Sequence, residues 1–347
     1  MMNCDHKSAT MYTTKNWFTV VLLLCLAAGA RAQQSVQFSQ YIFNGLSVNP
    51  AYAGYKDVLH LNASYRMQWA GIEGAPRTGS VSLDGPLRRA NKDANVGLGI
   101  QAMMDNLGPQ SAISIYASYA YRIRLDDEDT RRLCLGLGVG ATQYGLNGKD
   151  FIYLDNGDRI IPDGSAKATA PDARVGIYYY SPSLYIGVSV LDLFSKYSST
   201  GYKWRGYTYE SIRRKQHLYL TAGYMFAVND QISIKPSFML KDDFAGPTAI
   251  DATLMMHIDQ LLWIGGSYRT SMQLWNKKKT AETTVTLDKA NAASAILQYY
   301  ISPKYRIGYS YDYMMNKMSG IQSGSHEISI GILFNSKLFS TSNPRYF

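Results

Sequence analysis

Two short strings in this sequence contain residue types that could do chemistry, and each lacks part of the pattern that the chemistry needs. Residues Gly136–Ala141 have the sequence Gly-Leu-Gly-Val-Gly-Ala and match the Gly-x-Gly-x-x-Ala of dinucleotide-binding folds, which requires a helix directly after the glycines. Here the glycines continue the alternation of one strand, so we interpret them as small residues on a strand face. His326-Glu327 begins a zinc-protease motif, but Ile330 stands where the second histidine belongs. We therefore predict no cofactor and no metal site.

The histidines leave one enzymatic alternative open. His60, His217, His257 and His326 lie one to each predicted strand, and the first three have the parity of the inner face. A catalytic Ser–His pair must lie within hydrogen-bonding distance, which spacing along the chain does not establish between strands. A barrel of the lipase or protease kind is therefore an alternative, whereas our prediction is a protein that is not an enzyme and has no catalytic residues.

Charged clusters occur in segments that we predict to be loops. Asp155–Asp158 offers several oxygen ligands, but it lacks the spacing and the final Glu of a calcium-binding loop, and we interpret it as a turn. Arg213–Lys215 and Lys277–Lys279 would suit lipopolysaccharide phosphates or an acidic partner, and a solvated loop explains them equally well. Because the N-terminus predicts export, we expect no nucleic acid as a partner.

The N-terminus has the features of a secretory signal peptide. Lys7 and Lys15 precede an apolar stretch at Trp17–Ala28, and an Ala-x-Ala pattern ends at Ala32. We predict cleavage between Ala32 and Gln33, so that residues 1–32 form the signal peptide. The apolar stretch is too short to be a spanning helix.

Composition narrows the class of protein. Of the 347 residues, 46% are hydrophobic and only 18% are charged, which excludes a disordered chain. Cleavage leaves Cys134 as the one remaining cysteine, so no intrachain disulfide can form. A lipoprotein signal at Cys25 is a weaker alternative, because Leu24 is not the small residue that its processing needs. After Ala32 no apolar run approaches the roughly 18–20 residues of a transmembrane helix.

Period-two alternation recurs from Val58 to Phe334 and is typical of strands with one apolar face. Every second residue from Leu59 to Trp69 is apolar, over about the 9–11 residues that a tilted strand needs to cross a bilayer. The predicted strands start near Val58, Thr78, Asn95, Ala112, Arg132, Ala173, Leu184, His217, Gln231, Ala249, Leu261, Ala292, Tyr305 and Ser325. This pattern predicts an all-β fold, a transmembrane antiparallel up-and-down β-barrel of about 14 strands with both termini in the periplasm.

The connections between these strands alternate in length, as periplasmic turns and external loops do. The short ones are Asp126–Thr130, Ser181–Ser183, Ala227–Asp230, Asp259–Gln260 and Ser302–Lys304. The long ones are Gly145–Pro171, Leu191–Gln216, Thr270–Asn291 and Met315–Gly324. We expect residues 58–347 to form the outer-membrane barrel and residues 33–57 to form a plug or a periplasmic collar. Small residues on the inner face would leave either an open lumen or room for that plug.

An ordered set of motifs across the chain resembles the PorP/SprF family of type IX secretion system outer-membrane proteins. The motifs are Val48–Gly54, Ser64–Trp69, Gly71–Thr78, Asp105–Pro109, Ser118–Arg122 and Gly324–Ile328. The positions that we single out in them, for a tentative role in docking partners, are Asn49, Pro50, Tyr52, Gly54, Arg66, Gln68, Trp69, Arg122, His326 and Glu327. We interpret Asn49–Gly54 as the element that docks the N-terminal segment at the periplasmic mouth, since Pro50 restricts the backbone and Gly54 permits a turn.

The resemblance implies a non-enzymatic accessory component of the type IX secretion system in the cell outer membrane. It would support the secretion or surface attachment of cargo such as gliding adhesins, with cargo proteins, other secretion components, membrane lipid and lipopolysaccharide as partners. The long loops would hold the cargo, and the periplasmic side with Asn49–Gly54 would face the secretion apparatus. An Asn-Pro-Ala element also occurs in the FadL family, so a channel for apolar small molecules is the alternative.

Overall fold

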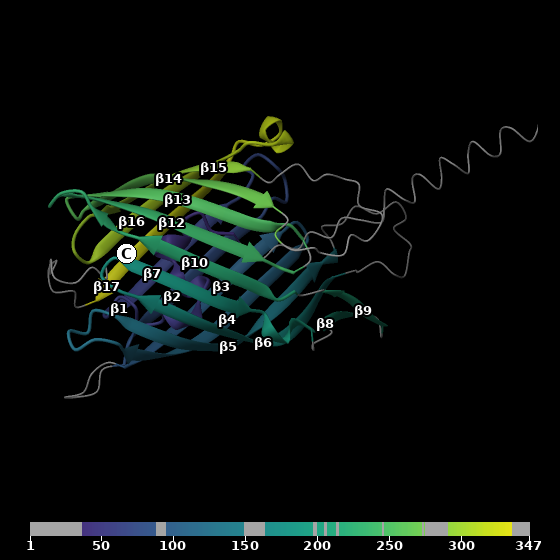
Figure 1. Ribbon diagram of the computed structural model, residues 1–347. Coiled ribbons are helices and arrows are strands. Elements are labelled where there is room, and N and C mark those ends of the chain that lie inside the picture. Colours follow the sequence, from purple (N-terminus) through teal and green to yellow (C-terminus); the bar gives the residue numbers. More distant parts are fainter. Residues whose placement is uncertain are drawn as a thin grey trace, which may run out of the picture. The chain divides into compact units, whose positions relative to one another are not determined.

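The computed structural model describes residues 37–87, 95–148, 164–196, 200–204, 207–212, 215–244, 246–272, 274 and 291–334. All of them belong to one compact unit, Ser35–Lys277 with Leu287–Phe347. Within this part of the chain, antiparallel neighbours form a continuous sheet that the pairing of β10 with β12 closes into a barrel of fourteen strands (Figure 1). The prediction of an all-β antiparallel barrel of about 14 strands is therefore confirmed. No helix in the described ranges is long and apolar enough to span a membrane.

The strands of the barrel follow one another around the ring in chain order. They are β1 (Leu59–Met67), β2 (Arg77–Pro86), β3 (Val96–Leu107), β4 (Gln110–Arg124), β5 (Arg132–Asn147), β6 (Ser165–Tyr180), β7 (Leu184–Leu191), β10 (His217–Tyr224), β12 (Ile232–Asp242), β13 (Thr248–Ile258), β14 (Leu262–Met272), β15 (Ala292–Tyr300), β16 (Tyr305–Met314) and β17 (Ser325–Phe334). The two-residue β11 (Phe226–Ala227) also pairs with β12. Each predicted start lies within two residues of an observed one, except that β6 begins at Ser165 rather than near Ala173.

The predicted connections need three corrections. The expected loop Gly145–Pro171 is strand at both ends, because β5 continues to Asn147 and β6 begins at Ser165. The expected loop Leu191–Gln216 contains a 3-10 helix, η5 (Leu193–Lys196), and a hairpin of β8 (Thr200–Trp204) with β9 (Tyr207–Ile212). The alternation of lengths is also not strict, since Gly108 and Pro109 alone join β3 to β4.

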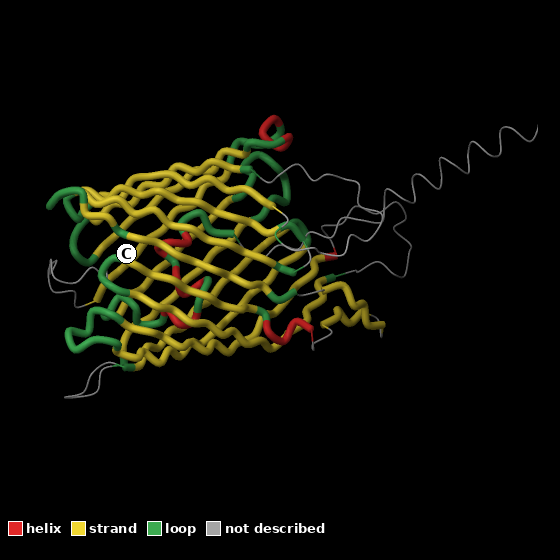
Figure 2. The backbone as a smooth tube through the Cα atoms, in the orientation of Figure 1, coloured by secondary structure: helices red, strands yellow, loops and turns green. Residues whose placement is uncertain are grey.

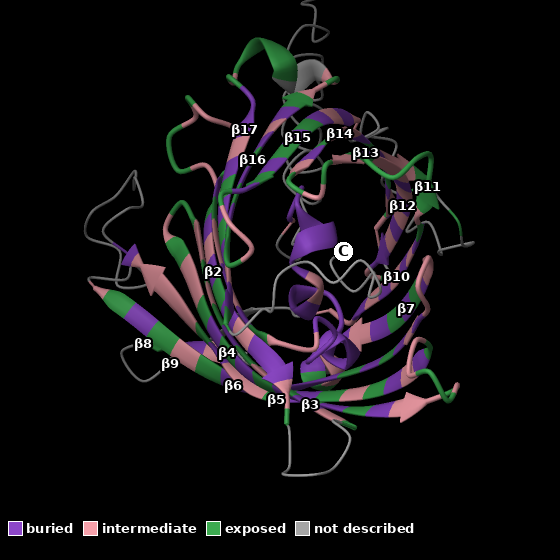
Figure 3. Ribbon diagram, turned by 90° about the vertical axis from the view of Figure 1, so that its left-hand side faces the viewer, coloured by how far each residue is buried: buried purple, intermediate pink, exposed green. Residues whose placement is uncertain are grey.

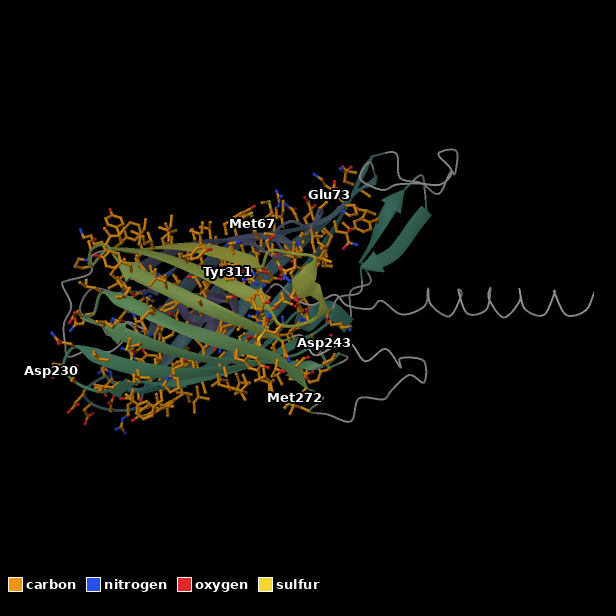
Figure 4. All side chains as sticks on the ribbon, turned by 90° about the horizontal axis from the view of Figure 1, so that it is seen from above. Met67, Glu73, Asp230, Asp243, Met272 and Tyr311 are labelled. Atoms are coloured by element: carbon orange, nitrogen blue, oxygen red, sulfur yellow. The ribbon has the colours of Figure 1, made fainter. Side chains whose placement is uncertain are left out.

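The two ends of the barrel differ. We call the end with the turns after β4, β6, β10, β13 and β15 the turn end, and the opposite end, which carries the hairpin β8–β9, the loop end (Figure 1). Figure 4 places Asp230 at the turn end and Glu73, Asp243 and Met272 at the loop end. Between Met315 and Gly324, the loop end also holds the short helix η6 (Lys317–Gly320). Leu59 pairs with Phe334, so the strand part of the chain begins and ends at the turn end.

The outer face of the barrel is apolar and the inner face is polar. Leu137 and Ile328 point outward and remain 50% and 56% exposed, whereas their neighbours Gly138 and Ser329 face inward and are buried. A continuous band of such exposed apolar side chains is stable against lipid and costly against water.

The lumen of the barrel is occupied by the N-terminal segment. Three short 3-10 helices lie inside the ring of strands, η1 (Tyr41–Phe43), η2 (Gly45–Ser47) and η3 (Pro50–Tyr52) (Figures 2 and 3). Nearly every residue of this segment is buried. The small residues of the inner wall therefore make room for it rather than for an open passage.

Candidate functional site: the segment inside the barrel

The segment Gln37–Asp57, which we call the lumenal segment, crosses the barrel lengthwise. Near its start, Ser39 contacts Glu327, the third residue from the loop end of β17. Near its finish, Gly54 contacts Asp84, the third residue from the turn end of β2. The chain therefore runs from the loop end to the turn end inside the lumen and then reverses into β1.

An ionic cluster holds the loop-end half of the lumenal segment. The guanidinium of Arg66 bonds to Asp312 Oδ2 at 2.5 Å and to Glu327 Oε2 at 3.2 Å, and all three side chains are at most 3% exposed. Ser39 completes the cluster, because its N–H donates to Glu327 (2.8 Å) and its hydroxyl donates to Asp312 (2.6 Å). We call Arg66, Asp312 and Glu327 the ionic clamp. Buried charges need such partners. Because its three residues lie on β1, β16 and β17, the clamp attaches the segment to three strands through Ser39.

Asn49 fixes the turn-end half of the segment. Its Oδ1 accepts from the N–H of Ala51 (2.9 Å) and so caps η3, where Pro50 occupies the first helical position. Its Nδ2 donates to the carbonyls of Ile177 (3.0 Å) and Val188 (3.3 Å), which face each other on β6 and β7. One side chain thus shapes the segment and bonds it to the wall.

Glycines form the wall on which this half of the segment lies. A Cβ added at any of three of them would collide with the segment, since real Cβ atoms are never so close to their neighbours. The collisions are from Gly97 to Ala53 O (1.9 Å), from Gly136 to Ala51 N (2.1 Å) and from Gly176 to Asn49 Oδ1 (2.1 Å). Gly136 belongs to the string that resembles a dinucleotide motif. Gly136 is a small residue within a strand, as we interpreted the string, and it lets the backbone of β5 approach the backbone of the lumenal segment closely.

Arg122 anchors the point where the segment leaves the lumen. Its Nη2 donates to Asp57 Oδ1 (3.1 Å) and to the hydroxyl of Tyr180 (3.1 Å). The ring of Tyr180 in turn meets Tyr55 edge to face at 4.8 Å. Asp57 has φ +59°, a left-handed conformation that the ion pair helps to hold at the junction with β1.

The other predicted site residues lie at the rim of the loop end. Trp69 has φ +52°, and its N–H donates to the hydroxyl of Ser325 (3.1 Å) just beyond β1, while Gln68 bonds through its backbone to Pro76. His326 points outward, where its Nδ1 bonds to the hydroxyl of Tyr309 (2.7 Å). The structure therefore brings Arg66 and Glu327 together but leaves Gln68, Trp69 and His326 outside the lumenal site.

The inward histidines have neighbours other than serine. His60 lies 3.4 Å from Asp84, and His217 lies 3.2 Å from Asp192. The ring of His257 stacks on Trp263 at 4.1 Å. Among the described residues, no serine hydroxyl bonds to a histidine ring, and no group of three or more His, Cys, Asp or Glu is placed to hold a metal ion.

Several predicted features lie outside the described residues. They are the cleavage site at Ala32 and Gln33, the acidic cluster Asp155–Asp158, the basic cluster Lys277–Lys279 and two members of the other basic cluster, Arg213 and Arg214. The third member, Lys215, pairs with Asp243 at 3.1 Å.

Sequence reasoning missed the acidic partners that complete the site. Asp312 has the inward parity of β16, and Asp84 has that of β2. A carboxylate on a buried inner face must be paired, so its parity is a signal for such a partner. Parity alone does not say which arginine of which strand is the partner.

A closed antiparallel barrel with an apolar outer face is typical of outer-membrane β-barrels, and in this one the lumen is filled. Among solved structures, the chain is similar to the CymD monoaromatic hydrocarbon channel, with a TM-score of 0.53, 12% identity, and 84% of this chain and 93% of that chain covered. It is also similar to the outer membrane protein Omp33 of Acinetobacter baumannii, with a TM-score of 0.42, 10% identity, and 80% and 98% covered. At 12% identity, the similarity to CymD shows the fold alone.

The family is shown by the sequence. Residues 30–332 match the family described as type IX secretion system membrane protein PorP/SprF, and the chain belongs to this family. No curated protein sequence matches the chain. The predicted resemblance is therefore confirmed, as is the prediction of a membrane protein rather than an enzyme. Membership implies association with the type IX secretion machinery.

Proposed function

We propose that this barrel is an accessory component of type IX secretion that supports the secretion or surface attachment of particular cargo proteins. Family membership over residues 30–332 is the observation that carries this proposal. The loop end would face the cell exterior and hold the cargo, chiefly through the connections between β5 and β6, between β7 and β10, and between β14 and β15. The turn end, with both ends of the strand region, would face the periplasm.

The burial of Asn49–Gly54 changes one part of the expected mechanism. Asn49, Tyr52 and Ala53 are at most 4% exposed. These residues are therefore not accessible to a secretion apparatus while the segment is seated. We infer that contact with the apparatus is made by the turns of the turn end instead.

The filled lumen favours the accessory role over the alternative of a channel for apolar molecules. CymD is a channel of that kind with a similar fold. In this chain, the lumenal segment contacts strands on opposite sides of the barrel, from Glu327 on β17 to Ser189 on β7. A solute could pass only after the segment had moved.

The test is quantitative proteomics of the cell surface and the culture medium, comparing wild type with a deletion of this gene. The accessory role predicts that one or a few large exported proteins disappear from the surface or move into the medium. A matched strain that carries the gene without residues 200–212, the hairpin β8–β9, should insert the barrel normally but lose the same proteins if the loop end binds cargo.

Unchanged proteomes would contradict the accessory role. In that case, uptake of a labelled apolar hydrocarbon should be measured in the same two strains. Slower uptake in the deletion strain would support the channel instead.

A further inference from the structure

A group of buried polar side chains at the turn end of the lumen has more positive than negative charge. Lys56 of the lumenal segment is 6% exposed, and Arg306, the second residue of β16, is 2% exposed. Asp84 is the carboxylate whose charge acts on Lys56. This group lies at the opposite end of the lumen from the ionic clamp and plays no part in it.

Neither cation forms a close ion pair with a carboxylate among the described residues. Arg306 donates to the neutral side chains of Gln298 (2.7 Å) and Asn62 (2.5 Å), and its guanidinium lies 5.3 Å from the ring centre of Phe43. The carboxylate of Asp84 is engaged by the N–H of Gly54 at 3.0 Å and lies 3.4 Å from His60. Two buried cations thus share one carboxylate, and burial of the excess positive charge is costly, so the site calls for an added anion.

The same place also contains hydrogen-bond donors that the described residues leave unused. The Nε of Arg306, the Nδ2 of Asn62 and the hydroxyl of Tyr52 are all buried and bond to no described residue. The orientation of the Asn62 amide is set, because its oxygen accepts from Arg306. Burial raises the pKa of Tyr52 well above its ordinary value, so its phenol stays protonated and is a donor.

Two of these donors come together on nearby strands of the wall. Arg306 on β16 reaches Asn62 on β1 across the intervening strand β17, where it passes over Gly331. A Cβ at Gly331 would lie 2.7 Å from Nε of Arg306 and would block this path. Tyr52 is within electrostatic range of both Arg306 and Asp84.

We propose that Lys56, Asn62, Arg306 and Tyr52 form a binding site for a small oxyanion, a phosphate or a carboxylate, inside the turn end of the lumen. An oxyanion supplies both the missing charge and the acceptors for three unused donors. It would join two residues of the lumenal segment to two residues of the wall. Bound anion would therefore hold the segment in the barrel, and its loss would loosen it.

The test uses the mature chain refolded into detergent in the presence of the probe, so that the seated segment cannot prevent access. The probes are inorganic phosphate and acetate, each compared with chloride at constant ionic strength. We expect a saturable rise of the unfolding midpoint with at least one probe, and retention of labelled probe by the folded protein in equilibrium dialysis. Binding of phosphate alone or of acetate alone would identify the class of oxyanion.

Matched variants locate the site. Lys56→Met and Arg306→Gln should weaken binding by roughly tenfold or more, and Tyr52→Phe by about fivefold. Tyr41→Phe is the control, since the hydroxyl of Tyr41 has Thr253 as its partner at 3.4 Å and lies outside the site. If Arg306→Gln does not fold, the two substitutions in the lumenal segment still test the site.

Two results would overturn the proposal. One is a wild-type protein that responds to phosphate and acetate no differently from chloride, which would mean that water satisfies the donors. The other is equal weakening by Tyr52→Phe and Tyr41→Phe, which would place the anion elsewhere.

Discussion

At the scale of single residues, the fit between wall and lumenal segment depends on individual glycines. Gly136 and Gly138 lie two residues apart on the inner face of β5, but only Gly136 approaches the segment too closely for a side chain. At Gly138, an added Cβ would make ordinary contacts at 3.4 Å and beyond. The two positions therefore form a matched pair for testing whether the segment is seated in solution.

We expect Gly136→Val to displace the lumenal segment and Gly138→Ala to leave it in place. The reporter is Cys134, which is 1% exposed and packs in one cluster with Ala51 and Tyr52. In protein prepared without residues 1–32, a maleimide should label Cys134 readily in Gly136→Val and slowly in Gly138→Ala and wild type. Equally slow labelling in all three proteins would show that the segment tolerates the valine.

A second pair of residues tests the depth of the wall in the bilayer. Leu137 points outward and is 50% exposed, and Gln143 lies on the same face of β5 nearer the loop end. Leu137→Arg should cost about 2–4 kcal/mol if it lies near the bilayer midplane, and Gln143→Arg should cost about 0–1 kcal/mol near the interface. The measurement is the urea dependence of folding into lipid vesicles. Equal costs would contradict the assigned difference in depth.

At the scale of elements, the strands could be predicted because their alternation is local. The extra length of β5 and β6 could not, since their outward positions beyond the apolar band, such as Asn147 and Lys167, carry no apolar pattern. The ionic clamp could not be predicted from the sequence either. Arg66, Asp312 and Glu327 come from three strands, and their alternation shows only that each faces inward. The pairing of distant strands determines which of them meet.

The clamp should stabilise the seated segment as a unit. Arg66→Gln leaves Glu327 buried without its cation and leaves Asp312 with the more distant Arg269, at 3.8 Å. Breaking a buried ion pair in this way typically costs about 3–5 kcal/mol. Glu327→Gln removes one carboxylate but leaves Arg66 with Asp312, so we expect a smaller cost. Urea unfolding of the two variants and the double variant measures the coupling between the residues. Additive costs would show that the clamp does not act as a unit.

Lys56 lies near the junction of the lumenal segment with β1, and it should make retention of the segment in the lumen depend on pH. Burial, with a smaller effect of Arg306 and an opposing effect of Asp84, lowers the pKa of Lys56 to about 7. A released segment would return the amine to its ordinary value, so release takes up a proton between about pH 7 and pH 10. Retention should therefore strengthen with rising pH in this window, by about 1.4 kcal/mol per unit.

The rate of Cys134 labelling measures this dependence in buffer without phosphate or carboxylate. Each rate is divided by that of Gly136→Val at the same pH, which corrects for ionisation of the thiol. The ratio should fall roughly tenfold per unit above pH 7 in wild type. In Lys56→Met it should be flat, and a slope that survives this substitution would assign the effect to another group.

At the scale of the whole molecule, the barrel and the lumenal segment form one structure, because the inner wall fits the segment closely. The segment is bonded at the loop end by the ionic clamp, along the middle by Asn49, and at the turn end by Arg122. These three attachments are spread over strands around the ring, so the segment also braces the barrel. Fourteen strands would otherwise enclose a water-filled or solute-sized space.

Removal of the segment should therefore open the barrel without preventing its insertion. The strands are closed by their own hydrogen bonds, including the pairing of β10 with β12, and none of these involves residues 37–56. In planar bilayers, wild type should show almost no conductance, and a chain without residues 37–56 should conduct steadily. Arg66→Gln should give brief openings, because only the loop-end attachment is lost. A wild-type barrel as conductive as the deletion would mean that the segment leaves the lumen in a membrane. That result would support the channel over the accessory role.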